Sequence, residues 1–415
     1  MAGLLHNWDK QNSRRRWIIV AAAFTLALLL FTATSYYSPP PQALHNPPQA
    51  ADHAHPFTNS SQAVSVPELT KPEGVPIVGY VFFGRKSRVE ILRCYIERNL
   101  VDNGGWLDEV HWVRNTDNPD DLVYLEEILK SSPRYKMIDL SSEGVGSVGF
   151  NNAWGHMERG KLYVKIDDDV VWMADDTIPR IVSMKVAHPE YFIVSANMIN
   201  SPLIGWIHYH MGAVHPYFPE YKGVFDSPSP HNNGLISPPT RKSWKYTDYP
   251  EWEGPDDWYF DLDQDPPYEG HRWLRLKNDT DLHRTPITKI EYATWGTGLN
   301  SWAIVAQEHY SFLENLLDDH LDLYKFKRVW LTDYERLSIN LITLWADEVL
   351  DNLPMDDGDE EWLTKLLPKR IGKSVAVESE ALGAHFSFSF QEPRLSASDV
   401  LPRYKDYAEE NVCHY

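Results

Sequence analysis

Apolar runs and amphipathic segments alternate along residues 75–199, and this alternation constrains the fold more than any other feature of the sequence. The β-branched and aromatic run "VPIVGYVFFG" (75–84) precedes a segment, 87–100, in which apolar residues recur at helical spacing. A second strand (108–116) and a second helix (120–132) are predicted to follow. Three more short strands are predicted at 135–140, 161–166 and 191–199. This alternation predicts an α/β sheet with helices on both faces.

The second half of the chain has a different character. Residues 205–289 are dense in Pro, Gly, His and aromatic residues, which favours a loop-rich insertion over a separate domain. Residues 294–317 then combine a glycine-containing turn, a short apolar strand and a helix. The pattern at 331–350 predicts an amphipathic helix whose N-cap could be Thr332 or Asp333. A solvated acidic loop (351–362) and a final strand (383–390) are expected to follow.

The N-terminus carries a segment that is not expected to join this fold. Residues 17–37 contain no charged side chain, approach the roughly 20 residues of a membrane-spanning helix, and directly follow Arg14, Arg15 and Arg16. The positive-inside rule then predicts a type II signal anchor, with a cytosolic tail (1–16), a Pro-rich stem (38–76) and a luminal domain (77–415). A cleaved signal peptide is the alternative, and both direct the chain into the secretory pathway.

Charge and cysteine content narrow the classes of partner. The 59 acidic and 39 basic residues give a formal net charge of -20, which argues against a nucleic-acid partner. A phosphorylated ligand at an acidic centre would be repelled unless a cation lay between them. Only Cys94 and Cys413 are present, so the chain could form one bridge or keep both thiols free, but it holds no thiolate metal site.

Three consecutive aspartates, Asp167, Asp168 and Asp169, end the predicted strand at 161–166. This is the strand edge at which open α/β sheets bind ligands. If the backbone stays extended, Asp167 and Asp169 point to one side and Asp168 to the other. Such a carboxylate pair suits Mg²⁺ or Mn²⁺, which would stabilise the charge of a departing diphosphate, as in reactions of nucleotide sugars. A simple turn is the alternative interpretation.

In this context the sequence resembles the luminal GT-A glycosyltransferases, especially the β-1,3-glycosyltransferase and fringe-like branches. Their D-x-D motif ends a strand of a Rossmann-like mixed sheet, and the resemblance covers about residues 77–390, apart from the insertion. It implies a hexosyltransferase of the Golgi or endoplasmic-reticulum membrane that uses Mn²⁺ or Mg²⁺. The implied donor is a UDP- or GDP-sugar, and the implied acceptor is a glycan or glycoprotein.

The resemblance also implies roles for single residues. Asp167, Asp169 and His385 would hold the metal, while the nucleotide sugar would contact residues of the first strand end, the triplet and "WGTGLNSW" (295–302): Arg85, Asp167, Asp168, Trp295, Gly296 and Gly298. Asp333 is the first candidate for the catalytic base and Glu335 the second. Asp333 could instead only cap a helix, His385 could simply pack beside Phe residues, and a retaining enzyme would need no base.

Other interpretations stay open. Aromatic and His residues of the insertion could stack on sugar rings or form a cluster under long loops: Trp206, His208, His210, Trp244, Trp252 and Trp258. Two other functions compete with transfer, namely a carbohydrate-binding or scaffold protein without turnover and a metal-dependent phosphoesterase. The sequons at Asn59 and Asn278 are consistent with a luminal location.

Overall fold

The computed structural model describes residues 69–144, 147–220, 243–356 and 358–413, which lie within one unit, Pro67–Tyr415. The predicted tail, membrane anchor and most of the stem lie outside the described residues. Within the part of the chain that the structure describes, no helix combines the length and the apolar character that crossing a bilayer requires.

The first elements are those that the alternating pattern predicts. Strand β1 (Ile77–Phe83) leads into helix α2 (Lys86–Arg98), and β2 (Glu109–Arg114) leads into α3 (Pro119–Ser131) and β3 (Tyr135–Asp139). Helix α3 begins where Pro119 follows Asn118, whose side chain accepts a hydrogen bond from the Asp120 amide at 2.9 Å. The three strands pair in parallel, as βαβ units require.

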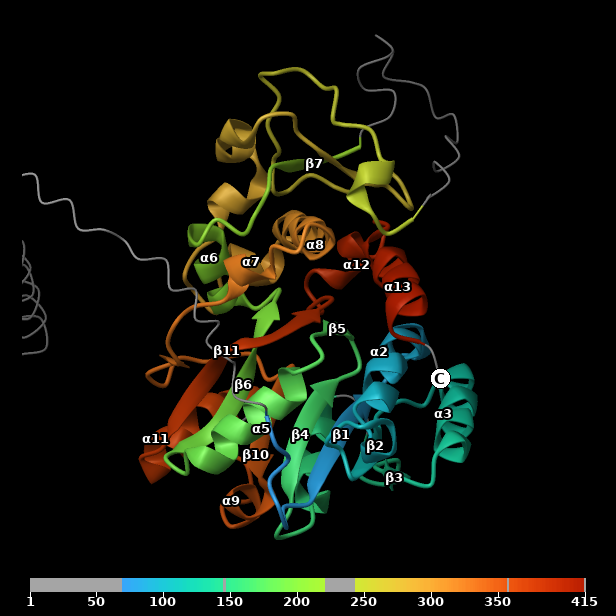
Figure 1. The fold of residues 1–415 in the computed structure, drawn as a ribbon, viewed down its shortest axis with the longest axis vertical. Coiled ribbons are helices and arrows are strands. Elements are labelled where there is room, and N and C mark those ends of the chain that lie inside the picture. Colours follow the sequence, from blue (N-terminus) through green and yellow to red (C-terminus); the bar gives the residue numbers. More distant parts are fainter. Residues whose placement is uncertain (1–68, 145–146, 221–242, 357, 414–415) are drawn as a thin grey trace, which may run out of the picture. The chain divides into compact units, whose positions relative to one another are not determined.

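The sheet continues through strands from both halves of the chain. These are β4 (Leu162–Asp167), β5 (Val170–Met173), β6 (Tyr191–Ile199), β9 (Trp330–Leu331), β10 (Leu341–Trp345) and β11 (Ser374–His385). Among the described residues they form one sheet in the order β3-β2-β1-β4-β10-β6-β11-β5, with β9 pairing β11 (Figure 1). Strand β10 is antiparallel to both neighbours, β4 and β6, so the sheet is mixed.

Both faces of the sheet are covered, as the pattern predicts. Alternate residues of β1 belong to different buried clusters: Ile77, Val81 and Phe83 lie in one, and Val78 and Tyr80 in the other. The first cluster includes residues of α2 and of α5 (Thr177–Ala187), which packs on β6 and β11 (Figure 1). The second includes residues of α9 (Ala346–Leu350) and α11 (Leu367–Ile371). The sheet is therefore the middle layer of the fold.

The remaining α-helices lie between the strands and after the last of them. They are α4 (Ser147–Ala153), α6 (Pro202–His210), α7 (Thr297–Asn300), α8 (Trp302–Leu317), α10 (Asp359–Glu361), α12 (Glu392–Leu395) and α13 (Val400–Asn411). Helix α8 packs on β6, while α13 packs on α2 and β5. A small antiparallel pair, β7 (Tyr217–Pro219) and β8 (Trp273–Arg275), lies in the insertion.

Three element predictions in the second half differ from the structure. The final strand predicted at 383–390 is displaced, because β11 spans Ser374–His385 and ends there. Residues 331–350 do not form one helix, because 341–345 is the strand β10, which is buried between β4 and β6. A strand buried on both faces is apolar throughout and is easily confused with a helix. The short apolar strand predicted within 294–317 is instead the start of α8, where the Ser301 side chain accepts from the Ile304 amide at 3.3 Å.

The described part of the insertion is irregular, as predicted, but most of its aromatic residues face the core. Trp244 and Trp252 are buried in the larger core cluster, and Trp258 packs against it. His208 is buried and its Nε2 lies 2.8 Å from Asn197 Oδ1. These four side chains pack against protein, which favours a cluster under loops for them. Trp206 is half-buried and His210 is exposed, so this packing does not decide between the two interpretations for them.

The two cysteines are paired. Cys94 in α2 and Cys413 after α13 form a disulfide, with their Cα atoms 4.9 Å apart. The bridge ties the end of the chain to the first helix of the sheet domain. The alternative of two free thiols is therefore excluded in this structure.

Candidate metal centre

Strand ends from distant parts of the chain meet at one edge of the sheet. Because β1, β2 and β4 are parallel, the residues after them lie together: Gly84 and Arg85, Asn115, and the aspartate triplet. Antiparallel β10 begins at the same edge, where the Asp167 amide donates to the Asn340 carbonyl at 2.9 Å. Strand β11 ends there at His385. The fold thus gathers polar side chains around the triplet.

The triplet does not continue as a strand. Asp167 is the last residue of β4, Asp168 and Asp169 form a turn, and β5 begins at Val170. Strand β11 pairs with β5 so that His385 lies opposite Val170, and the Phe386 amide donates to the Asp169 carbonyl at 2.8 Å. This pairing brings His385 beside Asp169, which strand alternation alone does not explain.

Each aspartate has different partners. Asp167 forms an ion pair with the buried Lys165 and accepts a hydrogen bond from Asn340 Nδ2 at 3.0 Å. Asp168 Oδ2 accepts from the Gly84 amide at 3.1 Å, and its Oδ1 accepts from Arg85 Nη2 at 2.6 Å. Asp169 Oδ2 accepts from the same Arg85 nitrogen at 2.7 Å, while its Oδ1 lies 3.2 Å from His385 Nε2.

Burial and charge shift the protonation of this group. Burial alone would raise the pKa of Asp169, but the hydrogen bond and charge of His385, together with Arg85 and Arg88, lower it well below its usual range. Burial would likewise lower the pKa of His385, but the charge and hydrogen bond of Asp169 raise it overall. Asp169 and His385 therefore favour the charged pair of carboxylate and imidazolium as long as no metal ion takes the place of the proton on His385.

Oxygen and nitrogen atoms of Asp167, Asp169 and His385 all lie within 4.8 Å of one another. Arg85 already occupies Asp169 Oδ2, so Oδ1 is the oxygen available to an ion. Two carboxylate oxygens and an imidazole nitrogen suit Mn²⁺, since carboxylates favour Mg²⁺ and Mn²⁺ and imidazole favours transition metals. The structure thus brings together the metal ligands that the resemblance implies.

A cavity of about 440 Å³ opens onto this group, and we call it the metal-site cavity. Carboxylates on its wall outnumber the cations Arg85 and Lys165: Asp167, Asp168, Asp169, Asp359, Glu360 and Glu392. Three buried atoms on the wall lack a hydrogen-bond partner among the described residues: Asn340 Oδ1, Ser387 Oγ and His385 Nδ1. Such atoms are costly unless a ligand or water satisfies them, so the wall is suited to a polar ligand.

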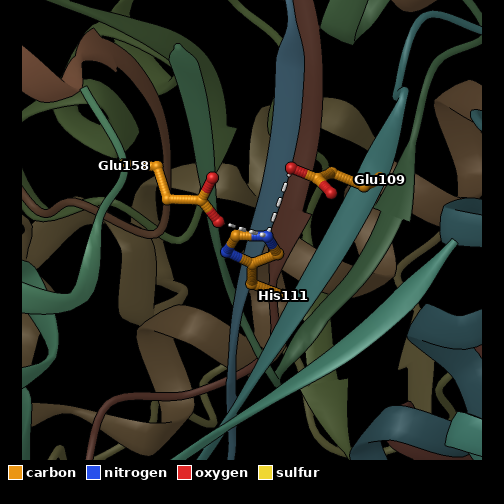
Figure 2. A group of neighbouring side chains, drawn as sticks. All are labelled: Glu109, His111 and Glu158. Carbon is orange, nitrogen blue, oxygen red and sulfur yellow. Dashed lines mark ion pairs between the residues drawn. The ribbon is translucent and has the colours of Figure 1, made fainter. Parts of the chain in front are cut away.

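A second group, Glu109, His111 and Glu158, also meets the spacing of metal ligands (Figure 2). His111 Nε2 lies 3.3 Å from Glu109 and 3.9 Å from Glu158. Lysines already balance both carboxylates, because Lys136 and Lys161 pair with Glu109, and Lys161 pairs with Glu158 at 2.7 Å. The first group is also paired with cations, Lys165 and Arg85, but it lines a cavity with further carboxylates on its wall, which favours it as the metal centre.

The other residues predicted to contact the nucleotide sugar do not all line a cavity. Arg85 lines the metal-site cavity, and Trp295 lines an adjoining cavity. Gly296 and Gly298 line neither cavity; a Cβ on Gly296 would meet Glu291 at 2.9 Å and one on Gly298 would meet Ile290 and Pro202. These glycines allow close packing within the protein, whereas their predicted contact with a ligand has no support in this geometry.

Neither candidate for the catalytic base lines these cavities. Asp333 and Glu335 are exposed in the turn after β9, and Asp333 has a backbone φ of 51°. The predicted helix does not form, so Asp333 caps no helix at this position.

The sequence pattern does not identify two of the residues that line the cavities. Asp359 and Glu360 line both cavities, although residues 351–362 are expected to form a solvated loop. Their sequence signal is an acidic run, which is typical of exposed loops. Tertiary contacts distinguish them from such a loop. Trp154 Nε1 donates to Asp359 at 3.2 Å, and Arg336 Nε donates to Glu360 at 2.7 Å.

No family model matches the sequence, and no curated protein matches it. Among solved structures, partial likenesses are found to 4-diphosphocytidyl-2C-methyl-D-erythritol synthase from Anaerococcus prevotii (13% identity, TM-score 0.23), TarS from S. aureus (16%, 0.24) and the mannosyltransferase PcManGT from Pyrobaculum calidifontis in complex with GDP-Man and Mn²⁺ (21%, 0.25). Each covers 30% of this chain, and 56%, 36% and 36% of the respective structure. The matches thus span about half of the first structure and about a third of the others, and they establish neither a family nor an activity.

Proposed function

We propose that this protein is a metal-dependent glycosyltransferase that uses a nucleotide sugar as donor. The observation that carries the proposal is the group Asp167, Asp169 and His385 at the carboxyl edge of a mixed α/β sheet, open to a cavity with an excess of carboxylates. A diphosphate enters such a cavity only with a cation that offsets the negative wall. The metal-ligating atoms and the negative charge of the wall therefore both favour a metal-bound diphosphate as the ligand.

The side chains of this site have different roles in binding. Asp167, Asp169 and His385 would hold Mn²⁺ or Mg²⁺, and a bound ion supplies Lewis-acid stabilisation of the departing diphosphate. Arg85 fixes both Asp168 and Asp169 through one guanidinium nitrogen, which orients the turn. The Asp168 carboxylate in turn accepts a hydrogen bond from the Gly84 amide, which links the turn after β4 to the loop after β1. The nucleotide would lie along these two loops.

We place the protein in the secretory pathway, with the sheet domain luminal and residues 17–37 as its anchor. Support comes from the Cys94–Cys413 disulfide, since structural disulfides persist in oxidising compartments. Asn278 of the second sequon is exposed, as a glycosylated asparagine must be. Golgi and endoplasmic-reticulum membranes both satisfy these conditions.

The test is binding of UDP and GDP to the full chain by calorimetry, with and without Mn²⁺, followed by hydrolysis of UDP- and GDP-sugars. We expect binding of at least one nucleotide only with Mn²⁺. Asp169→Asn should weaken Mn²⁺ binding by roughly 10–100-fold or more, because losing a ligand costs at least as much as losing its outer-shell partner. The control Asp139→Asn changes an exposed carboxylate at the end of β3, outside the cavity, and should bind Mn²⁺ normally.

Each alternative function has its own outcome in this experiment. Metal-dependent nucleotide binding without donor turnover would identify a binding protein on the same fold. Release of phosphate from p-nitrophenyl phosphate, with no affinity for nucleotide sugars, would identify a phosphoesterase. Normal Mn²⁺ affinity in Asp169→Asn would rule out the proposed metal centre.

A further inference from the structure

A second cavity of about 380 Å³ adjoins the metal-site cavity and shares part of its wall. We call it the aromatic cavity. The shared residues are Phe150, Asp359, Glu360, Phe388 and Ser389, so the two cavities meet at a carboxylate pair. The rest of the aromatic cavity comes from the ends of β6 and α7 and from the segment before β10, including Ser201, Leu299 and Ser338.

Large aromatic side chains that are not buried in the core line the aromatic cavity. Trp295 is 59% exposed and Phe390 is 62% exposed, and both line the cavity. The Arg336 guanidinium lies 4.2 Å from the centre of the Trp295 ring, which holds one face of the indole in place. A rigid aromatic face beside hydroxyl and carboxylate groups is the composition of a site that binds small polar molecules with apolar faces, as sugar rings are.

The charge on this wall selects the kind of sugar. Its ionisable side chains are Arg336, Asp359 and Glu360, and Arg336 is already paired with Glu360 at 2.7 Å and lies 3.9 Å from Glu361. No cation is therefore left on the described wall to balance an anionic ligand. A phosphorylated, sulfated or uronic-acid acceptor would be repelled, whereas a neutral saccharide would meet hydrogen-bond acceptors and an aromatic face.

Glu360 is placed to do more than bind. Its Oε1 accepts from Arg336 Nε, and no donor among the described residues contacts its Oε2. Asp359 is more constrained, because the Trp154 indole donates to Oδ2 at 3.2 Å and the Glu360 amide donates to Oδ1 at 2.9 Å. Burial raises the pKa of Glu360, and Arg336 only partly offsets this. A carboxylate with a raised pKa and one free oxygen is a suitable proton acceptor.

We propose that the aromatic cavity binds a neutral saccharide acceptor on Trp295 and that Glu360 Oε2 takes the proton from its attacking hydroxyl. This inference rests on the proposed function, since it supplies the second substrate of that transfer. The acceptor oxygen forms a bond to the anomeric carbon of the nucleotide sugar while the bond from that carbon to the diphosphate oxygen breaks. The electron pair of the broken bond leaves with the nucleoside diphosphate, and the hydroxyl proton moves to Glu360. Inversion at the anomeric carbon follows.

The acceptor test uses the full chain with Mn²⁺, a panel of UDP-sugars and GDP-mannose, and p-nitrophenyl glycosides. Neutral p-nitrophenyl glucoside, galactoside and mannoside are compared with p-nitrophenyl glucuronide. We expect transfer to at least one neutral glycoside and a kcat/KM for the glucuronide at least about tenfold lower. Trp295→Ala should raise the acceptor KM about tenfold, whereas Tyr259→Ala, an exposed aromatic outside both cavities, should not.

The base is tested by Glu360→Gln against Glu361→Gln, its neighbour, which lines neither cavity and pairs with Lys365 at 2.8 Å. Glu360→Gln should lower kcat by about 100-fold or more, for both transfer and donor hydrolysis, with unchanged Mn²⁺-dependent UDP or GDP binding. Glu361→Gln should retain the wild-type rate.

The outcomes separate this inference from the proposed function. A wild-type chain that binds no nucleotide in the presence of Mn²⁺ overturns both. Nucleotide binding and donor hydrolysis with a normal rate in Glu360→Gln overturns the role of Glu360 alone, as does a collapse of kcat in Asp359→Asn instead. Nucleotide binding without any turnover also overturns the role of Glu360. Equal use of the glucuronide, or no binding of any neutral glycoside, overturns the acceptor assignment.

Discussion

Glu308 is a buried acid that the proposed chemistry does not use. It lies in the middle of α8 and is only 6% exposed, and its Oε1 lies so close to Gly205 that a Cβ there would approach to 2.4 Å. Burial raises the pKa of Glu308 to about 8 from its usual 4.5, and a hydrogen bond from the Asn200 backbone only partly opposes this. The folded protein therefore holds this side chain in its neutral form at acidic pH.

This burial makes stability depend on pH. Because the folded pKa is raised, the stabilisation is complete below pH 4.5 and is lost as the pH rises toward about 8. The loss is on the order of 5 kcal/mol at a raised pKa of this size. Glu308→Gln should remove this dependence and make the protein more stable than wild type at pH 8, as measured by urea unfolding at pH 5 and pH 8. Glu409→Gln, an exposed residue of α13, should leave the wild-type slope, and a slope that persists in Glu308→Gln would contradict the assignment.

Single residues of the site differ in how far the sequence could predict them. Asp167 and Asp169 follow an apolar run directly, so their place at a strand end could be inferred from local pattern. Glu360 lies in an acidic run whose composition is typical of solvent-exposed loops, and only its contact with Arg336 and the two cavities distinguishes it. Local sequence carries no record of such a tertiary contact.

At the scale of elements, the segment after β11 depends on a pair of buried amides. Asn200 Nδ2 donates to the carbonyls of His385 and Phe386 at 3.2 and 3.0 Å, and Gln391 Nε2 donates to Asn200 Oδ1 at 3.1 Å. Gln391 Oε1 also accepts from the Phe388 amide at 3.0 Å. The pair thus fixes the end of β11, which carries the metal ligand His385, and the loop after it, which forms part of the shared cavity wall.

Removing this pair should loosen the metal centre without touching a ligand. Gln391→Ala removes the donor to the buried Asn200 Oδ1, so we expect a loss of about 1–3 kcal/mol in unfolding free energy. Mn²⁺ affinity should fall by roughly tenfold, as for other residues that orient metal ligands. Calorimetric titration with Mn²⁺ and thermal unfolding measure the two effects.

Gln307→Ala is the matched control for that variant. Gln307 is equally buried and bonds the Ile287 amide, the His215 carbonyl and Thr285 on the other side of α8. It should lose similar stability and keep normal Mn²⁺ affinity. Equal loss of Mn²⁺ affinity in both variants would show that the Gln391 effect is only general destabilisation.

Elements with a clear period were predictable, and those set by pairing partners were not. The alternating β1-to-β6 region follows from local pattern, because each amphipathic helix buries one face on the sheet. The segment that became β10 is apolar except for Thr343, which fits a buried helix equally well. Pairing with β4 and β6, far away in sequence, decided its conformation.

At the scale of the whole molecule, one covalent link joins distant ends of the sheet domain. The Cys94–Cys413 disulfide spans 319 residues of sequence, so it restricts the unfolded chain strongly. Reduction should lower the free energy of unfolding by about 2–5 kcal/mol, seen as a lower Tm in the presence of dithiothreitol. A Cys94→Ala, Cys413→Ala double variant should show the lower Tm in both conditions, and a Tm in wild type that does not respond to reduction would contradict this.

The general architecture of the molecule was predictable, but its connectivity was not. Composition and alternation indicate a layered α/β domain with a loop-rich insertion, and the described residues form a mixed sheet with both faces covered. Two cysteines permit one bridge, yet spacing alone does not decide whether it forms. That decision rests on α2 and α13 packing side by side, which is a property of the complete fold.

The position of β10 also sets the order in which this protein can be built during synthesis. Strands β4 and β6 are made early but do not touch each other, since β10, which lies more than 140 residues further along, fills the gap between them. Until residues 341–345 emerge, two central strands keep unpaired backbone edges. Folding must therefore wait for most of the chain, which makes a nascent or truncated chain dependent on chaperones to avoid aggregation.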